Sequence, residues 1–127
     1  MNKQIKRTER GWPGHFICSD SCIFRRNTLL EYFRFKIVIS TVGNMIRNSE
    51  RHEVGCNRNY ETMCFHAKKE GIYWDADVER RVDFDSEWMI EKLSTTSDQK
   101  ANEMHDNVVS EIEKKLLSGD FKEGDTD

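Results

Sequence analysis

Apolar residues are concentrated in one stretch of the chain, from Gly14 to Met45. Within it, residues 36–42 (KIVISTV) are apolar or β-branched at almost every position, which is typical of a strand buried on both faces. We predict a strand before this run, a basic turn at Arg25-Arg26-Asn27, a second strand, and a turn near Phe33-Arg34. Gly43-Asn44 is predicted to end the central strand, because glycine and asparagine commonly interrupt strands.

A second pair of strands is predicted further along the chain. Residues 46–59 are polar and indicate a long loop or an irregular edge strand. The alternating pattern then predicts a strand from Tyr60 to Lys68, a hairpin turn at Lys69-Glu70-Gly71, and an antiparallel return from Ile72 to Val78. The return strand places Trp74 with the apolar residues of one face.

Helical signals follow the strands. Asp85-Ser86 resembles an N-cap and predicts a short helix over roughly residues 86–94. A longer helix is predicted over about residues 98–118, with Gly119 as the residue that ends it. Apolar side chains recur along it at helical spacing, and they are Ala101, Met104, Val108, Ile112 and Leu116, with His105 and Val109 beside them.

Strands first and helices last predict an α+β fold, an antiparallel β-sheet of about five or six strands decorated by two C-terminal helices. We expect three parts: a basic flexible arm (1–10), a single α+β domain (11–118) and an acidic disordered tail (119–127).

Charge and composition limit the class of function. The 127 residues carry a net charge of −3, although 34% of them are charged. A binder of nucleic acid polymers is usually basic, so we expect no such partner. No apolar run approaches the ~20 residues that span a bilayer. The four cysteines and the missing signal sequence favour reduced thiols in a cytoplasm.

The cysteines offer one candidate metal site. Cys18 and Cys22 lie four residues apart with His15 close by, and Cys56 and Cys64 follow much later. Structural zinc sites usually contain two closely spaced ligand pairs, and the second pair here is eight residues apart. We therefore expect four independent thiols, no metal and no cofactor.

Carboxylates offer one candidate catalytic site. Asp75 and Asp77 point the same way from one predicted strand, and His66 lies on its neighbour, as a metal-dependent nucleotide hydrolase would require. The alternative is a solvated strand face, with cross-strand pairs to Lys68 or Arg80. We favour the second interpretation and expect no catalytic residues, because no nucleophile or phosphate-binding motif accompanies the pair.

Arginine–asparagine groups are a stronger signal. One guanidinium group can bind two phosphate oxygens at once, and the amide of asparagine can form hydrogen bonds with the edge of a base. An aromatic ring such as Tyr60 or Trp74 can stack on a base. Polar or amphipathic groups near the helical stripe would complete a pocket. The resulting ligand-binding candidates are Arg25, Arg26, Asn27, Arg58, Tyr60, Trp88, Asn102 and His105. The alternative for each arginine is a surface ion pair with a nearby glutamate.

Several segments resemble the first anti-Thoeris family of phage proteins, which sequester nucleotide signals. These segments, spread over residues 7–118, are GWPGHFICSDSCIFRRNTLL, IVISTVGNM, NYETMCFHA, GIYWDADVERRVDF and ANEMHDNVVSEI. The resemblance implies a decorated antiparallel sheet that assembles into dimers or higher oligomers such as hexamers. It also implies binding, without cleavage, of cyclic ADP-ribose isomers made by TIR-domain proteins, and in some members of cyclic di- and trinucleotides at separate sites.

In this family, sites are built from arginines, an aromatic residue and an asparagine at a subunit interface. The resemblance carries this role to Arg25, Arg26, Arg58, Trp88 and Asn102. We therefore expect a phage-encoded anti-defence protein, not an enzyme, that sequesters a cyclic nucleotide signal in the cytoplasm of the infected bacterium. The alternatives are the hydrolase described above and an inhibitor that binds a host defence protein directly through its helix and acidic tail.

Overall fold

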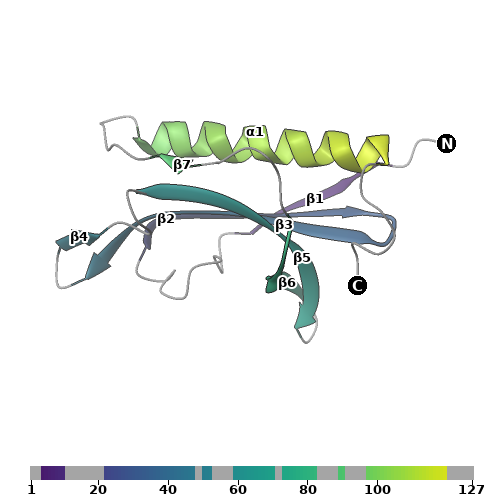
Figure 1. Ribbon diagram of the computed structural model, residues 1–127, viewed down its shortest axis with the longest axis horizontal. Coiled ribbons are helices and arrows are strands. Elements are labelled where there is room, and N and C mark those ends of the chain that lie inside the picture. The colour runs from purple at the N-terminus through teal and green to yellow at the C-terminus, as the bar shows by residue number, and fades with distance from the viewer. Residues whose placement is uncertain are drawn as a thin grey trace.

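The computed structural model describes residues 4–10, 22–47, 50–52, 59–70, 73–82, 89–90 and 97–119. Their fold is α+β, as predicted, with an antiparallel sheet and a C-terminal helix (Figure 1). The elements are β1 (Lys6–Arg10), β2 (Cys22–Tyr32), β3 (Phe35–Arg47), β4 (Glu50–His52), β5 (Tyr60–Glu70), β6 (Tyr73–Arg81), β7 (Met89–Ile90) and α1 (Ser97–Ser118). Five strands follow the order β1-β2-β3-β5-β6, while β4 pairs with β3 and β7 pairs with β5.

The helix α1 lies lengthwise over one face of the sheet (Figure 1). Its apolar stripe is the predicted one, and Val108, Val109 and Ile112 are buried against Leu30, Ile37, Ile39 and Cys64 of the sheet. Gly119 follows the helix with a positive φ of 79°, as the predicted terminating residue should. No helix of the described residues is long and apolar enough to cross a membrane.

The central strand β3 is buried on both faces, as its sequence predicts. From Ile37 to Val42 every side chain is at most 1% exposed. Alternation places Ile37, Ile39 and Thr41 under α1, and Val38, Ser40 and Val42 on the opposite face. The strand therefore separates two environments, one on each side of the sheet.

The second face is partly covered by the β5–β6 hairpin, which bends away from α1 (Figure 1). The pairing of β5 with β6 shifts register between Phe65 and Ala67, and such a bulge increases local bend and twist. Trp74 of β6 consequently packs against the cluster of Leu29, Val38 and Ala67.

The predicted break at Gly43-Asn44 is wrong, because β3 continues to Arg47. Tyr60 is the register partner of Gly43 on β5, and a Cβ atom at position 43 would overlap its ring. Glycine is used here for close packing of an aromatic ring on the strand backbone and does not end the strand.

Two further expectations from the sequence differ from the strands that the structure shows. Arg25-Arg26-Asn27, predicted as a turn, lies inside β2, where each residue pairs with β3. The polar segment 46–59, predicted as a loop or an edge strand, contributes the end of β3 and the short strand β4. The turn at Phe33-Arg34 is found as predicted, and Phe33 adopts a positive φ of 54°.

The expected short helix near residues 86–94 is wrong where the structure describes it. Met89 and Ile90 form β7, which pairs with Glu61 and Tyr60 of β5, and the rest of that helix lies outside the described residues. Lys6–Arg10, expected in a flexible arm, form β1 at the edge of the sheet. The acidic residues 120–127 and the strand expected over 15–18 lie outside the described residues.

The contact of Gly43 with Tyr60 gives a test of the fold. Replacing Gly43 with Ala forces a methyl group into the Tyr60 ring, and overpacking of this kind destabilises by about 1–3 kcal/mol. We expect that loss in the free energy of unfolding measured by urea denaturation. In a Tyr60→Ala background the same Gly43→Ala change should lower the free energy of unfolding only slightly. An equal loss in both backgrounds would contradict the packing of Tyr60 on Gly43.

Candidate functional site

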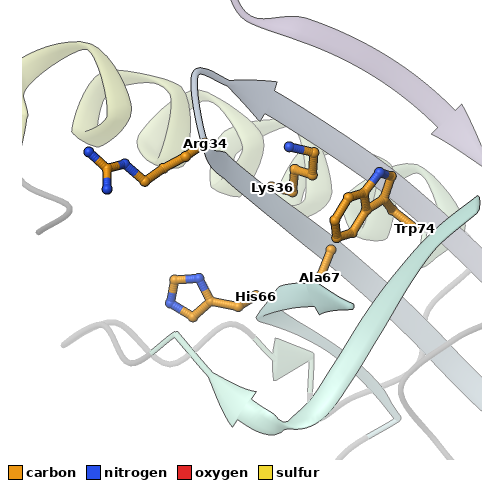
Figure 2. Close-up of a pocket in the computed structure, with 5 residues that line it drawn as sticks. All are labelled: Arg34, Lys36, His66, Ala67 and Trp74. Carbon is orange, nitrogen blue, oxygen red and sulfur yellow. The ribbon is translucent and has the colours of Figure 1, made fainter. Parts of the chain in front are cut away.

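A small open hollow lies on the face away from α1, near the β2–β3 turn. It contains about 290 Å³ of empty space, and its described lining residues are Arg34, Lys36, His66, Ala67 and Trp74. Figure 2 shows Arg34 and His66 on one side of this space and Trp74 on the other. Much of this space is open to solvent, and the enclosed volume is only about 80 Å³, well below the range of about 300–1,000 Å³ for small-molecule sites, so the hollow can hold only part of a ligand.

Three separate pieces of the chain build this hollow. Arg34 belongs to the two-residue turn, and Lys36 follows it on β3. His66 lies on β5 between Phe65 and Ala67, where the pairing with β6 shifts register, and it pairs with Ile37 of β3. The extra residues of this bulge are on β6, because the two steps from Phe65 to Ala67 match the five steps from Ala76 to Arg81. Trp74 enters from β6, as the register partner of Lys69.

Positive charge gathers around the indole of Trp74. The ammonium nitrogens of Lys36 and Lys69 lie 4.8 Å and 5.6 Å from the ring centroid. Glu31 is the register partner of Lys36, but its carboxylate ion-pairs with Lys6 at 3.8 Å. Among the described residues that line the hollow there is no carboxylate. The chemistry of the hollow therefore suits an anion that carries a planar ring.

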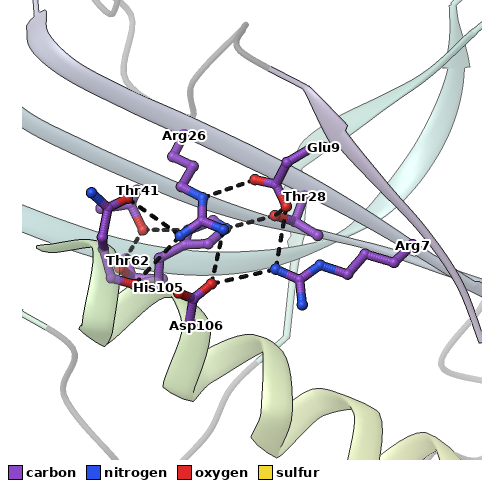
Figure 3. Close-up of polar contacts among 9 residues, drawn as sticks. Arg7, Glu9, Arg26, Thr28, Thr41, Thr62, His105 and Asp106 are labelled. Carbon is purple, nitrogen blue, oxygen red and sulfur yellow. Dashed lines mark hydrogen bonds and ion pairs between the residues drawn. The ribbon is translucent and has the colours of Figure 1, made fainter.

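A second polar group of residues, which we call the helix–sheet cluster, lies between α1 and strands β1, β2, β3 and β5 (Figure 3). Its members are Arg7, Glu9, Arg26, Thr28, Thr41, Thr62, Asn102, His105 and Asp106. Arg26 donates from Nε to Glu9 and contacts Asp106 through Nη2, both at 2.8 Å. Arg7 lies 3.3 Å from each of the same two carboxylates. Two cations and two anions thus balance at the rim of the cluster.

The interior of the cluster is a directional chain of hydrogen bonds. An ionised Glu9 only accepts, so the hydroxyl of Thr28 donates to it at 2.9 Å. The oxygen of Thr28 must then accept from His105 Nε2, 2.7 Å away, which leaves Nδ1 without a proton. Nδ1 in turn accepts from Thr41, also at 2.7 Å, and Thr41 accepts from Thr62 at 2.6 Å. The chain therefore defines the tautomer of a neutral imidazole.

The pKa values of the cluster agree with this assignment. Burial, assisted by the charge of Arg26, lowers the pKa of His105 to about 4, against the opposing effect of Glu9 and Asp106. Burial by itself raises the pKa of the Glu9 carboxyl, but hydrogen bonds from Arg26 and Thr28 outweigh it and hold that pKa below its ordinary value. Asp106 behaves in the same way, because Arg26 and Arg7 lower its pKa more than burial raises it. At neutral pH the cluster holds a neutral imidazole and two carboxylates.

Three of the predicted ligand-binding residues meet in this cluster. Arg26 Nη1 donates to Asn102 Oδ1 at 3.3 Å, and His105 lies beside them on α1. The contacts of Arg26 and His105 are made within the protein, and His105 is 0% exposed. The structure therefore brings these three residues together, and the contacts that it shows for Arg26 and His105 are with other residues of the protein.

The other predicted residues are dispersed. Arg25 is exposed and lies on the face opposite Arg26, while Asn27 is 3% exposed and its Oδ1 has no hydrogen-bond partner in the described part of the chain. Tyr60 is buried against Gly43 and donates to Asp98 of α1 at 2.5 Å. Arg58 and Trp88 lie outside the described residues.

The structure describes some residues of the candidate hydrolase site and of the candidate zinc site. Asp75 is the register partner of Lys68, the cross-strand neighbour that the alternative interpretation names. Cys64 is buried in the core and is not part of a disulfide, whereas His15, Cys18 and Cys56 lie outside the described residues. Within the described ranges, no three histidine, cysteine or acidic side chains are placed to hold a metal ion.

Sequence reasoning names Trp74 as a possible stacking residue but misses Arg34 and Lys36 as its neighbours. The available signal was the alternation after the turn, which places Lys36 on the outer face of β3. The missing information was the bend of the β5–β6 hairpin, which brings Trp74 over that face.

Comparison with models of protein families, with characterised proteins and with solved structures finds no match to this chain.

The buried imidazole makes stability depend on pH. Between pH 6.5 and about 4 an unfolded chain protonates His105 and the folded chain does not, so stability falls as the pH falls through this window. The loss should approach roughly 3 kcal/mol at pH 4, with no further contribution from this group above pH 7. We expect urea denaturation at several pH values to show this slope in the wild type.

A His105→Gln variant provides the comparison, because it lacks the titrating group. It should be less stable at pH 7, and its stability should change less between pH 6.5 and 4.5. Glu9 and Asp106 contribute at lower pH, since their pKa values lie below the ordinary ones. Equal pH slopes in the two proteins would show that His105 is not held neutral by the fold.

Proposed function

We propose that this protein binds a small nucleotide-type anion at the hollow beside Trp74 and sequesters it without cleaving it. The observation that carries the proposal is the pair of lysine ammonium groups at the face of an accessible indole, next to a hollow whose described lining contains no carboxylate. A phosphate group matches the cations and a base matches the indole.

The energies favour replacement of the lysines by a base. A cation–π contact at an exposed site contributes about 0.5–1 kcal/mol, whereas stacking of one base contributes about 1–3 kcal/mol. The displaced ammonium groups of Lys36 and Lys69 then have a phosphate within reach, and hydrogen bonds to charged groups contribute about 1.5–3 kcal/mol each. A nucleotide thus gains binding free energy both at the indole ring and at the two lysines, while an uncharged nucleoside gains it only at the ring.

The same energies indicate that one hollow is not enough for tight sequestration. One stacked base and the charge-assisted bonds of Lys36 and Lys69 sum to about 4–9 kcal/mol, and association costs at least about 4 kcal/mol. Micromolar binding requires a net value of about −8 kcal/mol. Our proposal therefore includes further contacts, from residues outside the described ranges or from a second copy of the chain in a homo-oligomer.

The sequence resemblance supplies the candidate ligand, a cyclic ADP-ribose isomer used as a bacterial immune signal. Such a compound has the features that the hollow suits, namely two phosphates and a purine. The proposed biological role is that of a phage protein that removes this signal in the cytoplasm of the host. Arg25, Arg58 and Trp88 stay candidates for the additional contacts.

Retention of an intact ligand tests the proposal. Protein is incubated with cyclic ADP-ribose, freed of unbound compound, heated, and the released compound is identified by mass spectrometry. We expect recovery of unchanged ligand from the wild type, at least tenfold less from Trp74→Leu, and at least a third as much from Trp74→Phe, which keeps a stacking ring. A degraded product or no retention by the wild type would overturn the proposal.

Salt dependence tests the role of the two lysines. Replacing both Lys36 and Lys69 with Met keeps their apolar stems and removes two charges, so affinity at low salt should fall by about tenfold and become less sensitive to salt. Isothermal titration at 50 and 300 mM NaCl measures both effects. Lys114→Met, an exposed change on α1, is the matched control and should behave as the wild type. An unchanged salt dependence in the double variant would exclude direct contact of the lysines with the ligand.

A further inference from the structure

Glu31 on β2 lies between two lysines in the register of the sheet. It is paired with Lys6 of β1 on one side and with Lys36 of β3 on the other. Residues directly opposite each other on neighbouring strands have Cβ atoms about 4.5–5.5 Å apart, so the carboxylate of Glu31 has either ammonium group within reach. Which lysine it contacts decides whether Lys36 is left for a ligand.

The structure shows Glu31 paired with Lys6. The carboxylate lies 3.8 Å from Nζ of Lys6, and within the described residues no ion pair joins it to Lys36. Lys36 instead holds its ammonium group 4.8 Å from the centroid of the Trp74 indole (Figure 2). The Glu31 side chain is only 24% exposed, and partly buried charges are screened less than exposed ones. Without Lys6, this carboxylate would therefore gain by turning to Lys36.

The position of Lys6 is fixed by the strand that carries it. Among the described strands, β1 pairs only with β2. On the face toward α1 it joins the helix–sheet cluster, where Arg7 lies 3.3 Å from Asp106 and Glu9 accepts from Arg26 at 2.8 Å. These contacts hold β1 in register, so the cluster on one face of the sheet supports the pair of Lys6 with Glu31 on the other.

We propose that Lys6 is a positioning residue of the anion site, which holds the carboxylate of Glu31 and so keeps Lys36 available to a phosphate group. The inference rests on the proposed function and adds to it a residue outside the hollow that controls its affinity. A carboxylate turned to Lys36 would neutralise one of the two ammonium groups at the indole and repel an anion. Opposite charges at facing positions of two strands change an equilibrium by a factor of up to about five.

A double-mutant cycle on Lys6 and Glu31 tests the inference, with isothermal titration of cyclic ADP-ribose at 50 mM NaCl. Lys6→Met should weaken binding about threefold, because Glu31 then competes for Lys36. Glu31→Gln should bind at least as tightly as the wild type, and the double variant should match Glu31→Gln within about 1.5-fold. If Lys6→Met costs as much in the Glu31→Gln background as alone, Lys6 attracts the ligand directly and the inference is wrong.

A measurement without ligand follows the same contact. The ε-protons of Lys36 lie at the indole of Trp74, so the ring current should move their NMR signal upfield in the wild type. Glu31 is on β2 and Trp74 on β6, on opposite sides of β3, so a contact with Glu31 draws Lys36 away from the ring. The upfield shift should therefore shrink in Lys6→Met and return in the double variant. Lys6→Arg, which keeps the charge, should behave as the wild type in both measurements.

The two measurements separate the possible failures. If the wild type binds cyclic ADP-ribose and Lys6→Met changes neither the affinity nor the Lys36 signal, this inference is wrong while the proposed function stands. If the wild type does not bind the compound, the proposed function fails, and the Lys36 signal alone decides whether Lys6 keeps Glu31 away from Lys36.

Discussion

Burial of the His105 imidazole between helix and sheet is the constraint on which the fold depends. A buried polar group without a partner costs about 1–3 kcal/mol, so both ring nitrogens need hydrogen bonds in the assembled protein. Thr28 on β2 and Thr41 on β3 provide them, each at 2.7 Å. The helix can satisfy both nitrogens only at one rotation and one height above the sheet. Apolar contacts of Val108 and Ile112 drive the helix onto this face, but they are less directional and do not select that position by themselves.

The same constraint determines how charge is distributed over the two faces of the sheet. The chain of hydrogen bonds ends at Glu9, whose carboxylate also holds Arg26, and Asp106 completes the charge balance. An anionic ligand at Arg26 would compete with two carboxylates that are already in contact with the guanidinium. On the opposite face the contacts of Lys36 and Lys69 with Trp74 are weaker and more easily exchanged. An anion would therefore meet less competition from carboxylates at Trp74 than in the helix–sheet cluster, although Arg26 is the more conspicuous residue in the sequence.

How much the sequence could predict depended on whether a feature is determined by residues close to it in the chain or by distant ones. Patterns that depend on near neighbours were informative: the stripe of α1, the burial of β3 on both faces, and the turn at Phe33-Arg34 are all confirmed. Features that depend on distant residues were not accessible. Arg25-Arg26-Asn27 resembles a polar turn until Glu9 and Asp106 are known to lie beside Arg26. Gly43 resembles a strand end until Tyr60 is seen to cover it.

The candidate site could not be predicted from the sequence for the same reason, because a bend of the β5–β6 hairpin brings its residues together and no sequence motif marks them. Trp74 alternates with polar residues along β6, as many half-buried aromatic residues do, and nothing in its own neighbourhood identifies a ligand. The bulge, whose extra residues lie on β6 between Ala76 and Arg81, bends the β5–β6 hairpin, so that the indole reaches Lys36 on β3 and the ring of His66 borders the same hollow. A change that removed the bulge would keep every residue of the hollow and separate them. The geometry of the bulge, rather than the identity of any one side chain, is therefore the property that a functional comparison with other proteins has to match.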